Sequence, residues 1–218
     1  MDSYKDLSSS LTENFYSYMK KYNSLYQTLT ERSIQYLSIN DKPFIIDLGS
    51  GPGFLTLNLQ QKLPNAIIIG LEPSGEMLRS IPRDLIHKDT YFMQAQAENI
   101  PITSSSVDMI ISRYSIPYWD NINLALSEIY RILKPGGHVI FEALNKSYPF
   151  WKLKLISISM HLKKAPKNVI AYHIDAYNQC YTYDQLKKLL TDHHFLIKYE
   201  EYKKTQWRFL IVGEKPQD

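Results

Sequence analysis

The stretch FIIDLGSGPGF, residues 44–54, decides the fold. Its first five residues are apolar except for Asp47, which predicts a buried β-strand. The next five contain Gly49, Gly51 and Gly53, and an apolar segment with helical spacing follows them. Glycine adopts positive φ and lets a ligand approach the backbone where a Cβ atom would collide. A glycine loop between a strand and a helix is typical of nucleotide-binding α/β folds.

An acidic residue follows in the next structural unit. Glu72 ends the apolar run 66–71 and lies 19 residues after Gly53. A carboxylate there can accept hydrogen bonds from both hydroxyls of a ribose. Each feature alone is weak evidence, since a glycine cluster can be a tight turn and a strand-end glutamate is often only solvated. Together, in successive units, they predict a nucleoside-binding site.

Strand-like and helical patterns alternate through the middle of the chain. Strands are expected at 44–48, 66–71, 90–94, 107–112 and 138–144, and helices at 54–63, 75–81 and 123–133. This alternation predicts an α/β, Rossmann-like three-layer sandwich with a mostly parallel sheet. Beyond it, a capping box at Thr182–Gln185 predicts a helix, and segments 195–202 and 207–213 predict a C-terminal antiparallel hairpin.

Two further capping boxes, Ser10–Glu13 and Thr28–Glu31, predict N-terminal helices, the second ending near 40–43. We therefore expect one domain over 1–218. Its parts are an N-terminal helical cap (1–40), a cofactor-binding core (41–144), a lid insertion (145–181), and a helix plus hairpin (182–218).

Composition excludes several classes of protein. The single cysteine, Cys180, excludes an intrachain disulfide framework and a multi-cysteine zinc site, and no metal site is expected. The net charge of +3 gives no reason to expect a nucleic-acid partner. No apolar run is long enough to span a membrane, and residues 1–10 are too polar for a signal peptide. We expect a cytoplasmic protein.

Several segments together carry a family resemblance. They are the glycine loop at 45–54, LEPS at 71–74 with Met77 and Leu78, QAENIP at 96–101, SVDMI at 106–110 and LKPGG at 133–137. In this order the chain resembles the class I S-adenosylmethionine-dependent methyltransferases, in the small-molecule (type 11-like) branch related to quinone biosynthesis. The resemblance covers about residues 44–144.

The resemblance implies S-adenosylmethionine as cofactor, and methyl transfer by in-line displacement to an O, N or C nucleophile of a small molecule. The cofactor-binding residues that it implies are Asp47, Gly49, Ser50, Gly51, Gly53, Glu72, Pro73, Met77, Ala97, Glu98 and Arg113. In the family pattern the glycine loop meets the cofactor's amino-acid end and Glu72 binds its ribose. Met77, Ala97 and Glu98 surround the adenine, and Arg113 and Tyr114 lie beside the sulfonium.

The insertion is expected to form a lid that contacts the acceptor. Between residues 146 and 174 there are six lysines and no Asp or Glu. Two apolar stripes follow helical spacing on opposite faces: Trp151, Leu155, Ile158 and Leu162 on one, and Leu153, Ile156 and Met160 on the other. One face is expected to pack on the domain. The other is open to an acidic or apolar acceptor, a second subunit or a peripheral membrane contact, and the oligomeric state is not predicted.

Catalytic candidates are few, because methyl transfer depends mainly on positioning. His173, Tyr114 and Arg113 are the candidates, and His161 and Asp175 are further proton acceptors in the lid. The aromatic residues that can wall the cleft are Tyr4, Tyr16, Tyr22, Tyr118 and Trp119.

Two other functions stay open. An NAD(P)-dependent Rossmann oxidoreductase usually has a third glycine or alanine where this sequence has Phe54, which counts against it. The other alternative is a non-catalytic protein that binds the cofactor and a partner enzyme. Titration with S-adenosylmethionine and NADH, followed by a turnover assay, discriminates among the three.

Overall fold

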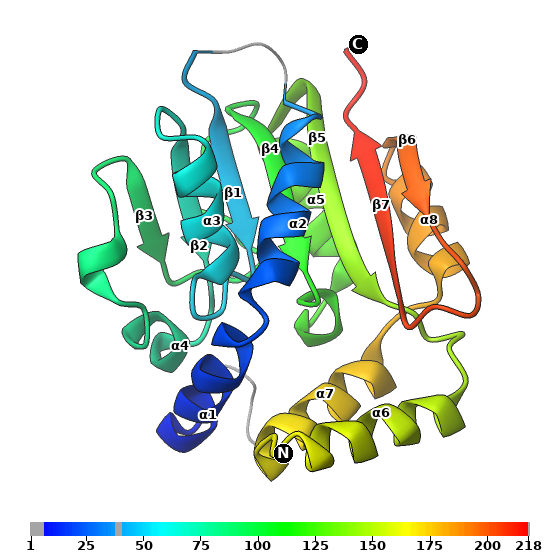
Figure 1. Cartoon of the computed structure of the whole chain (residues 1–218). Helices are drawn as coiled ribbons and strands as arrows, with labels where there is room; N and C mark the ends of the chain where they lie inside the picture. Colours follow the sequence, from blue (N-terminus) through cyan, green and yellow to red (C-terminus); the bar gives the residue numbers. More distant parts are fainter. Residues whose placement is uncertain (1–6, 38–40, 218) are drawn as a thin grey trace.

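The computed structural model describes residues 7–37 and 41–217 (Figure 1). Within these ranges seven strands form one sheet in the order β3-β2-β1-β4-β5-β7-β6. The strands are β1 Phe44–Leu48, β2 Ile67–Leu71, β3 Thr90–Met93, β4 Val107–Arg113, β5 Leu133–Leu144, β6 Leu196–Glu201 and β7 Arg208–Glu214. The first five are parallel, and β7 runs antiparallel to both β5 and β6. The predicted fold class is confirmed.

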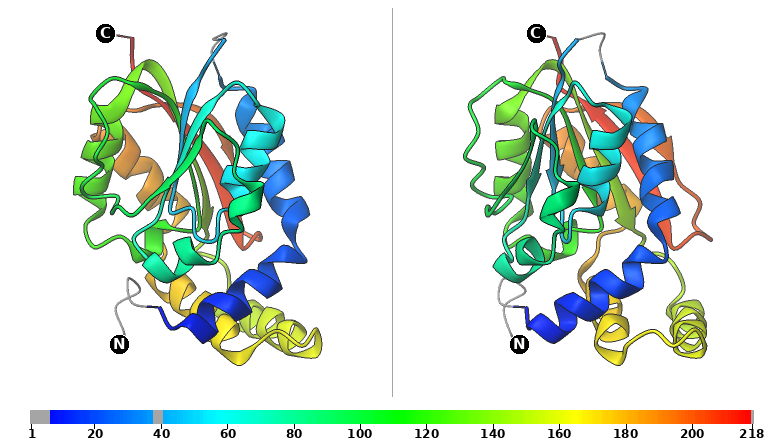
Figure 2. Two further views of the ribbon diagram at one scale, coloured as in Figure 1. Left: turned by 90° about the vertical axis from the view of Figure 1, so that its left-hand side faces the viewer. Right: turned by 60° about the vertical axis from the view of Figure 1, so that its left-hand side comes forward.

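Helices cover both faces of the sheet. The longer ones are α1 Ser9–Lys20, α2 Asn23–Ile34, α3 Phe54–Lys62, α5 Ile122–Ile132, α6 Phe150–Leu162, α7 Lys167–Gln179 and α8 Tyr183–Asp192; α4 (Gly75–Arg79), η1 (Arg83–Leu85) and η2 (Ile116–Tyr118) are short. In Figure 2 the sheet lies between α2 and α3 on one side and α5 and α8 on the other. Each face has its own apolar cluster.

The apolar strands are explained by burial on both faces. Ile45 packs into the cluster that contains α2 and α3, while its neighbour Ile46 packs into the cluster that contains α5 and α8. Both are fully buried. Successive side chains of a strand point to opposite faces, so a strand covered on both sides is apolar throughout.

The carboxyl ends of the parallel strands meet at one edge of the sheet. The connection from β1 leads to β2 on one side, whereas β4 pairs with β1 on the other. This reversal leaves a crevice between the loops after β1 and β4, where α/β sheets bind ligands. Helices α1, α6 and α7 lie at this same end of the molecule (Figure 1).

Two predicted helix starts are wrong. Helix α1 is capped by Ser8, whose Oγ accepts from the Leu11 amide at 3.3 Å, two residues before the predicted box. Thr28 lies in the middle of α2, and its Oγ1 donates to the Ser24 carbonyl at 3.0 Å. A Ser/Thr-x-x-Glu pattern inside a continuous helix is not a cap, because the hydroxyl bonds the preceding turn. The capping box at Thr182–Gln185 is confirmed. Of the predicted helix end at 40–43, residues 41–43 lie in the loop before β1, and residue 40 lies outside the described residues.

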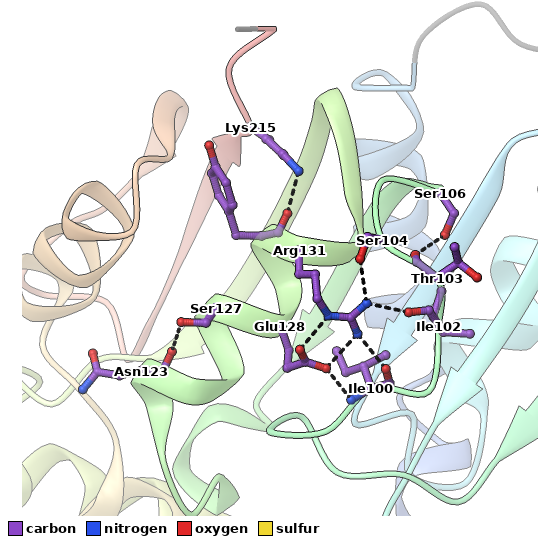
Figure 3. Close-up of polar contacts among 11 residues, drawn as sticks. Ile100, Ile102, Thr103, Ser104, Ser106, Asn123, Ser127, Glu128, Arg131 and Lys215 are labelled. Carbon is purple, nitrogen blue, oxygen red and sulfur yellow. Dashed lines mark hydrogen bonds and ion pairs between the residues drawn. The ribbon is translucent and has the colours of Figure 1, made fainter.

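A polar clamp holds the loop after β3. Arg131 of α5 donates to the carbonyls of Ile100 at 2.9 Å and Ile102 at 2.8 Å (Figure 3). Glu128, paired with Arg131 at 2.7 Å, accepts from the Ile100 amide at 2.9 Å. The clamp therefore fixes the segment that follows Ala97 and Glu98.

Candidate functional site

The glycine loop turns sharply off β1. Gly49, Gly51 and Gly53 have φ of +78°, +53° and +81°, and the amides of Gly49 and Ser50 both donate to the Leu71 carbonyl, at 2.8 and 2.9 Å. A Cβ atom at Gly49 would lie 2.3 Å from that of Ser115. At Gly51 the same atom would meet no described atom within 4 Å. The loop therefore packs tightly at its first glycine and leaves open space at its second.

Glu72 connects the end of β2 to this loop. Its Oε2 accepts from the Gly51 amide at 3.0 Å, and its Oε1 accepts from the Ser74 amide at 2.9 Å. The residue is buried, and burial raises the pKa of its carboxyl to about 7 against the opposing effect of these two bonds. An ionised carboxylate has about four lone-pair positions, so it can still accept from further hydroxyls.

Asp47 is the second buried acid. Its Oδ2 accepts from the Thr56 hydroxyl at 2.6 Å, which ties the end of β1 to the first turn of α3. Burial raises the pKa of the Asp47 carboxyl to about 7. Both predicted acids are therefore placed beside the glycine loop with raised pKa values.

One cleft brings together most of the predicted residues. Those that line it are Asp47, Gly49, Ser50, Gly51, Glu72, Met77, Arg113, Tyr114, Tyr118 and His173. Helix α1 adds Phe15 and Met19, and α7 adds Tyr172. The Ser50 hydroxyl is itself buried, without a hydrogen-bond partner in the described part of the chain. The Ser50 amide donates to Leu71 and its carbonyl accepts from the Gly53 amide at 3.0 Å, so the residue supports the loop.

The remaining predicted cofactor residues lie next to this cleft. Pro73, Ala97 and Glu98 line a small adjoining hollow that shares Gly49 and Tyr118 with it. Glu98 Oε1 accepts from the Asn121 amide at 3.0 Å. Gly53 lines neither space; it starts α3, and a Cβ there would lie 2.9 Å from the Phe92 ring. Gly53 thus supports the turn.

Arg113 lies at the centre of a buried charged cluster. Its guanidinium carbon lies 4.4 and 4.2 Å from the ring centroids of Tyr26 and Tyr114. Its Nε donates to Glu142 at 2.6 Å, and Arg208 pairs with the other oxygen of the same carboxylate at 2.9 Å. Two cations share one carboxylate, so Glu142 neutralises Arg113 only in part.

Tyr114 has a strained backbone, with φ of +57° directly after β4. Its amide donates to the Glu142 carbonyl at 2.9 Å, which holds the turn in place. Tyrosine rarely adopts this conformation, and such residues are concentrated at functional sites. Burial raises the pKa of the Tyr114 hydroxyl, so this group is a neutral hydrogen-bond donor near neutral pH.

His173 faces the cleft from α7. The Val169 carbonyl accepts from Nδ1 of His173 at 2.7 Å. A carbonyl cannot donate, so the neutral ring carries its proton on Nδ1 and presents Nε2 as an acceptor. Burial lowers the pKa of the imidazole, and the nearby charge of Arg113 also lowers it. Neutral His173 therefore has the form that a proton acceptor needs.

Aromatic rings link the two helices that cover the cleft. The ring of Tyr172 stacks on that of Tyr118 with centroids 4.9 Å apart, and its edge meets Phe15 of α1 at 5.5 Å. The Tyr118 hydroxyl donates to the Tyr172 carbonyl at 3.2 Å. Tyr118 is thus a wall residue, as expected.

A second cavity adjoins the cleft, and we call it the chamber. It lies among α1, α2, α6 and α7, and it shares Met19, Arg113, Tyr114, Leu144 and His173 with the cleft. Most of its other lining side chains are apolar or aromatic: Tyr18, Tyr22, Leu25, Leu153, Ile156, Met160, Ile170, Ile174, Tyr177 and Trp207. The charged cluster and His173 therefore stand between a polar cleft and an apolar chamber.

Some candidates lie elsewhere. Tyr16 stacks on Phe54 at 5.1 Å and lines neither the cleft nor the chamber, and Trp119 borders only the small hollow. His161 and Asp175 are exposed. Tyr4 lies outside the described residues.

Comparison with known proteins matches the middle of the chain to methyltransferases. Residues 46–141 match a family described as methyltransferase domain. A malonyl-[acyl-carrier protein] O-methyltransferase of Marinomonas sp. is 29% identical over 126 residues, 57% of this chain and 47% of the relative. A chloroplastic 2-methyl-6-phytyl-1,4-hydroquinone methyltransferase of Oryza sativa is 29% identical over 93 residues, 43% of this chain and 28% of the relative.

The solved structures agree on the fold. A crystal structure from Methanococcus maripaludis, described as a proposed S-adenosylmethionine-dependent methyltransferase, has a TM-score of 0.71 at 24% identity, over 100% of this chain and 97% of that one. This chain has the core of a class I S-adenosylmethionine-dependent methyltransferase. It spans about half or less of the length of most of the curated relatives that it matches.

The oxidoreductase alternative is not favoured, and Phe54 supplies a physical reason. Its ring stacks against Tyr26 of α2 at 5.4 Å, and Tyr16 of α1 covers it as well. The position that dinucleotide folds keep small is thus filled by a ring that anchors the N-terminal helices.

Among residues 7–37 and 41–217 no helix is long and apolar enough to cross a membrane. The same residues contain no cluster of three or more His, Cys, Asp or Glu side chains suited to a metal ion.

The sequence did not single out all of the residues of the candidate site. Tyr26, Glu142 and Arg208 complete the charged cluster, and Phe15 and Tyr172 close the aromatic cover. Glu142 had a detectable signal, because it is an acid inside the apolar strand HVIFEAL, 138–144. Arg208 had none, since its contact depends on how β7 pairs with β5.

Proposed function

We propose that this chain transfers the methyl group of S-adenosylmethionine to a small, largely apolar acceptor that carries an acidic or polarised oxygen. The observation that carries the proposal is that the cleft at the glycine loop and the apolar chamber meet at Arg113, Tyr114 and His173. When bound, S-adenosylmethionine would supply an electrophilic methyl group to the acceptor's nucleophile, which attacks in line with the breaking carbon–sulfur bond and releases S-adenosylhomocysteine.

The residues of the cleft fit this cofactor. The open space at Gly51 accommodates a group that approaches the loop backbone. Glu72 keeps lone pairs for the ribose hydroxyls after accepting two backbone amides. Met77 is buried at the cleft wall, where it packs against the adenine, and Ala97 and Glu98 bind the edge of the base from the adjoining hollow. Asp47 meets the cofactor's ammonium group through water.

The chamber holds the apolar body of the acceptor. Arg113 is neutralised only in part, so it attracts a polarised oxygen of the acceptor and keeps it close to the reacting methyl group. Methylation then occurs at that oxygen or at a carbon activated by it. The relatives named above are a carrier-protein O-methyltransferase and a hydroquinone methyltransferase, whose names fit such an acceptor.

His173 accepts the proton that the nucleophile loses. Its Nε2 is available because Nδ1 is engaged by Val169. Helices α1 and α7 act as a lid, since Phe15 and Tyr172 cover the cleft and exclude water from the transfer. Exclusion of water and correct positioning supply most of the rate in this reaction.

Calorimetry tests the cofactor assignment. The folded chain is titrated separately with S-adenosylmethionine, S-adenosylhomocysteine and NADH. We expect heat of binding with the first two and none with NADH. Absence of heat with both sulfur nucleosides overturns the proposal.

Turnover tests the rest of the proposal. The chain is incubated with S-adenosylmethionine labelled at the methyl group and a metabolite extract, which is then divided into organic and aqueous fractions. We expect label in an organic-soluble product, and Gly51→Val as a control that produces none. Tight cofactor binding without transfer to any extract component contradicts a catalytic role.

A further inference from the structure

Helix α6 exposes an apolar stripe that belongs to none of the apolar clusters of the described residues. Trp151, Leu155, Ile158 and Leu162 follow one another at intervals of four, three and four residues, so they lie on one helical face. Their exposed fractions are 61%, 57%, 54% and 80%. We call these four residues the outer stripe. Soluble monomers rarely expose contiguous apolar patches of this kind unless they bind something.

The opposite face of α6 has a different role. Leu153, Ile156 and Met160 line the chamber, and each is less exposed than the residues of the outer stripe. Helix α6 therefore separates the chamber, on its inner face, from the outer stripe on its opposite face. Figure 1 shows α6 at the periphery of the molecule, with α7 beside it and no helix or strand beyond it.

Lysines surround the outer stripe. At 100° per residue, Lys152 and Lys154 fall on its two sides. Their Nζ atoms lie 5.4 Å from the Trp151 ring and 5.3 Å from the Phe150 ring, so the ammonium groups stand close to the exposed aromatic rings. Across 146–174 the chain has six lysines and no acid. The surface is apolar at its centre and carries a lysine on each side.

We propose that the outer stripe of α6 docks this protein onto an anionic lipid bilayer. An apolar stripe with a tryptophan enters the boundary between headgroups and acyl chains, while the flanking lysines meet lipid phosphates. A helix of 13 residues is about 20 Å long and lies in the plane of the interface. The charge of the surface and its shape therefore both match this partner.

The same charges argue against a second copy of the chain as the occupant. A two-fold interface through α6 places two copies of this helix against each other, so Lys152 and Lys154 of one copy face a helix whose charged side chains are all lysines apart from His161. With no Asp or Glu between 146 and 174, the segment itself supplies nothing to neutralise them. Like charges held together across an interface are repulsive.

Docking has a consequence for the acceptor, which rests on the proposed function. The inner face of α6 lines the chamber, so a bilayer against the outer stripe lies one helix away from the acceptor site. An apolar acceptor dissolved in the membrane then reaches the chamber without crossing water.

Vesicle flotation tests the docking. The full chain is mixed with vesicles of phosphatidylglycerol and phosphatidylcholine, or of phosphatidylcholine alone. We expect flotation with the anionic vesicles, weakened by salt, and little with the neutral ones. Leu155→Ser with Ile158→Ser lowers the partition at least tenfold. Leu124→Ser on α5 is the matched control, because Leu124 is also 54% exposed, and it leaves partition unchanged.

Charge and fluorescence provide independent readouts. Lys152→Gln with Lys154→Gln lowers partition to anionic vesicles more than Lys187→Gln with Lys188→Gln on α8, which removes the same net charge. Tryptophan emission shifts to shorter wavelength on anionic vesicles, and Trp151→Phe loses most of the shift although Trp119 and Trp207 remain.

Three results overturn the docking: no flotation of folded protein with anionic vesicles, equal flotation of the outer-stripe variant, or a dimer in solution that Ile158→Ser abolishes. Calorimetry with S-adenosylmethionine on the same samples separates the two proposals. Cofactor binding without flotation refutes the docking alone, and flotation without cofactor binding refutes the proposed function alone.

Discussion

The cleft and the chamber meet at Arg113, yet different kinds of groups line them. The cleft is made of backbone amides, two buried carboxylates and strand ends, held by hydrogen bonds of 2.6 to 3.0 Å. The chamber is lined mainly by side chains from four helices, most of them apolar or aromatic. A site for one fixed cofactor constrains the backbone, whereas an acceptor site can be changed by side chains alone. The predictions below test this contrast, beginning with the largest expected effect.

Gly51→Val is expected to abolish cofactor binding, with affinity reduced more than 100-fold, while circular dichroism still shows a folded protein. The side chain enters open space beside the loop and also requires φ of +53°. Gly136→Val is the matched control, since Gly136 has φ of +75° near the start of β5, outside both the cleft and the chamber. Unchanged affinity of Gly51→Val for S-adenosylmethionine, measured by calorimetry, refutes the placement of the cofactor.

His173→Gln is expected to lower methyl transfer about 100-fold, within the usual range for a general base, and to leave cofactor affinity unchanged. Because the pKa of His173 is lowered, the wild-type ring stays neutral, and the rate is maintained, to pH values below the ordinary value of about 6.5. The rate then falls on acidification as Nε2 is protonated, and this acidic limb disappears in the variant. His161→Gln, at an exposed position, is the control, and an acidic limb that persists in His173→Gln assigns the proton acceptor elsewhere.

The fold was readable from the sequence because its signals are local. Apolar runs, the glycine loop and Glu72 each occupy a few consecutive positions, and their order determines the sheet. The Arg113 cluster was not readable, because it joins residues 26, 113, 142 and 208 through strand register and helix packing. The division of the insertion into α6 and α7 also escaped prediction, although its two apolar stripes were visible.

Stability against pH tests the burial of the acids. The pKa of Glu72 is raised from 4.5 to about 7, so the folded state holds a proton that the unfolded state releases between these values. The stability gained by this proton is complete below pH 4.5 and is lost as pH rises through 7, by up to about 3 kcal/mol. We expect the free energy of unfolding of the wild type, relative to Glu72→Gln, to fall over this window in urea titrations. A difference that does not vary with pH contradicts the burial of this carboxyl.

Glu72→Ala is expected to weaken S-adenosylmethionine binding by about 1 to 3 kcal/mol, since two ribose hydroxyls lose their acceptor. Asp108→Ala is a suitable control. Asp108 also accepts a backbone amide, that of Phe44 at 2.8 Å, but it lies at the start of β4, at the opposite end of the strand from the cleft. Calorimetry on both variants should show a loss only for Glu72→Ala, and a loss below about 0.3 kcal/mol would place the ribose elsewhere.

The smallest effect on cofactor binding is expected at α6, and it tests the contrast between the two regions most directly. Leu155→Ser with Ile158→Ser changes two side chains that are more than half exposed, so the free energy of unfolding should stay within about 0.5 kcal/mol of the wild type. Ile156→Ser with Met160→Ser changes the chamber wall on the same helix and should impair methyl transfer to an apolar acceptor. Neither pair touches the cleft, so both should bind S-adenosylmethionine with wild-type affinity. If Ile156→Ser with Met160→Ser lowered the affinity for S-adenosylmethionine as much as it lowered methyl transfer to the acceptor, the cleft and the chamber would be one site rather than two.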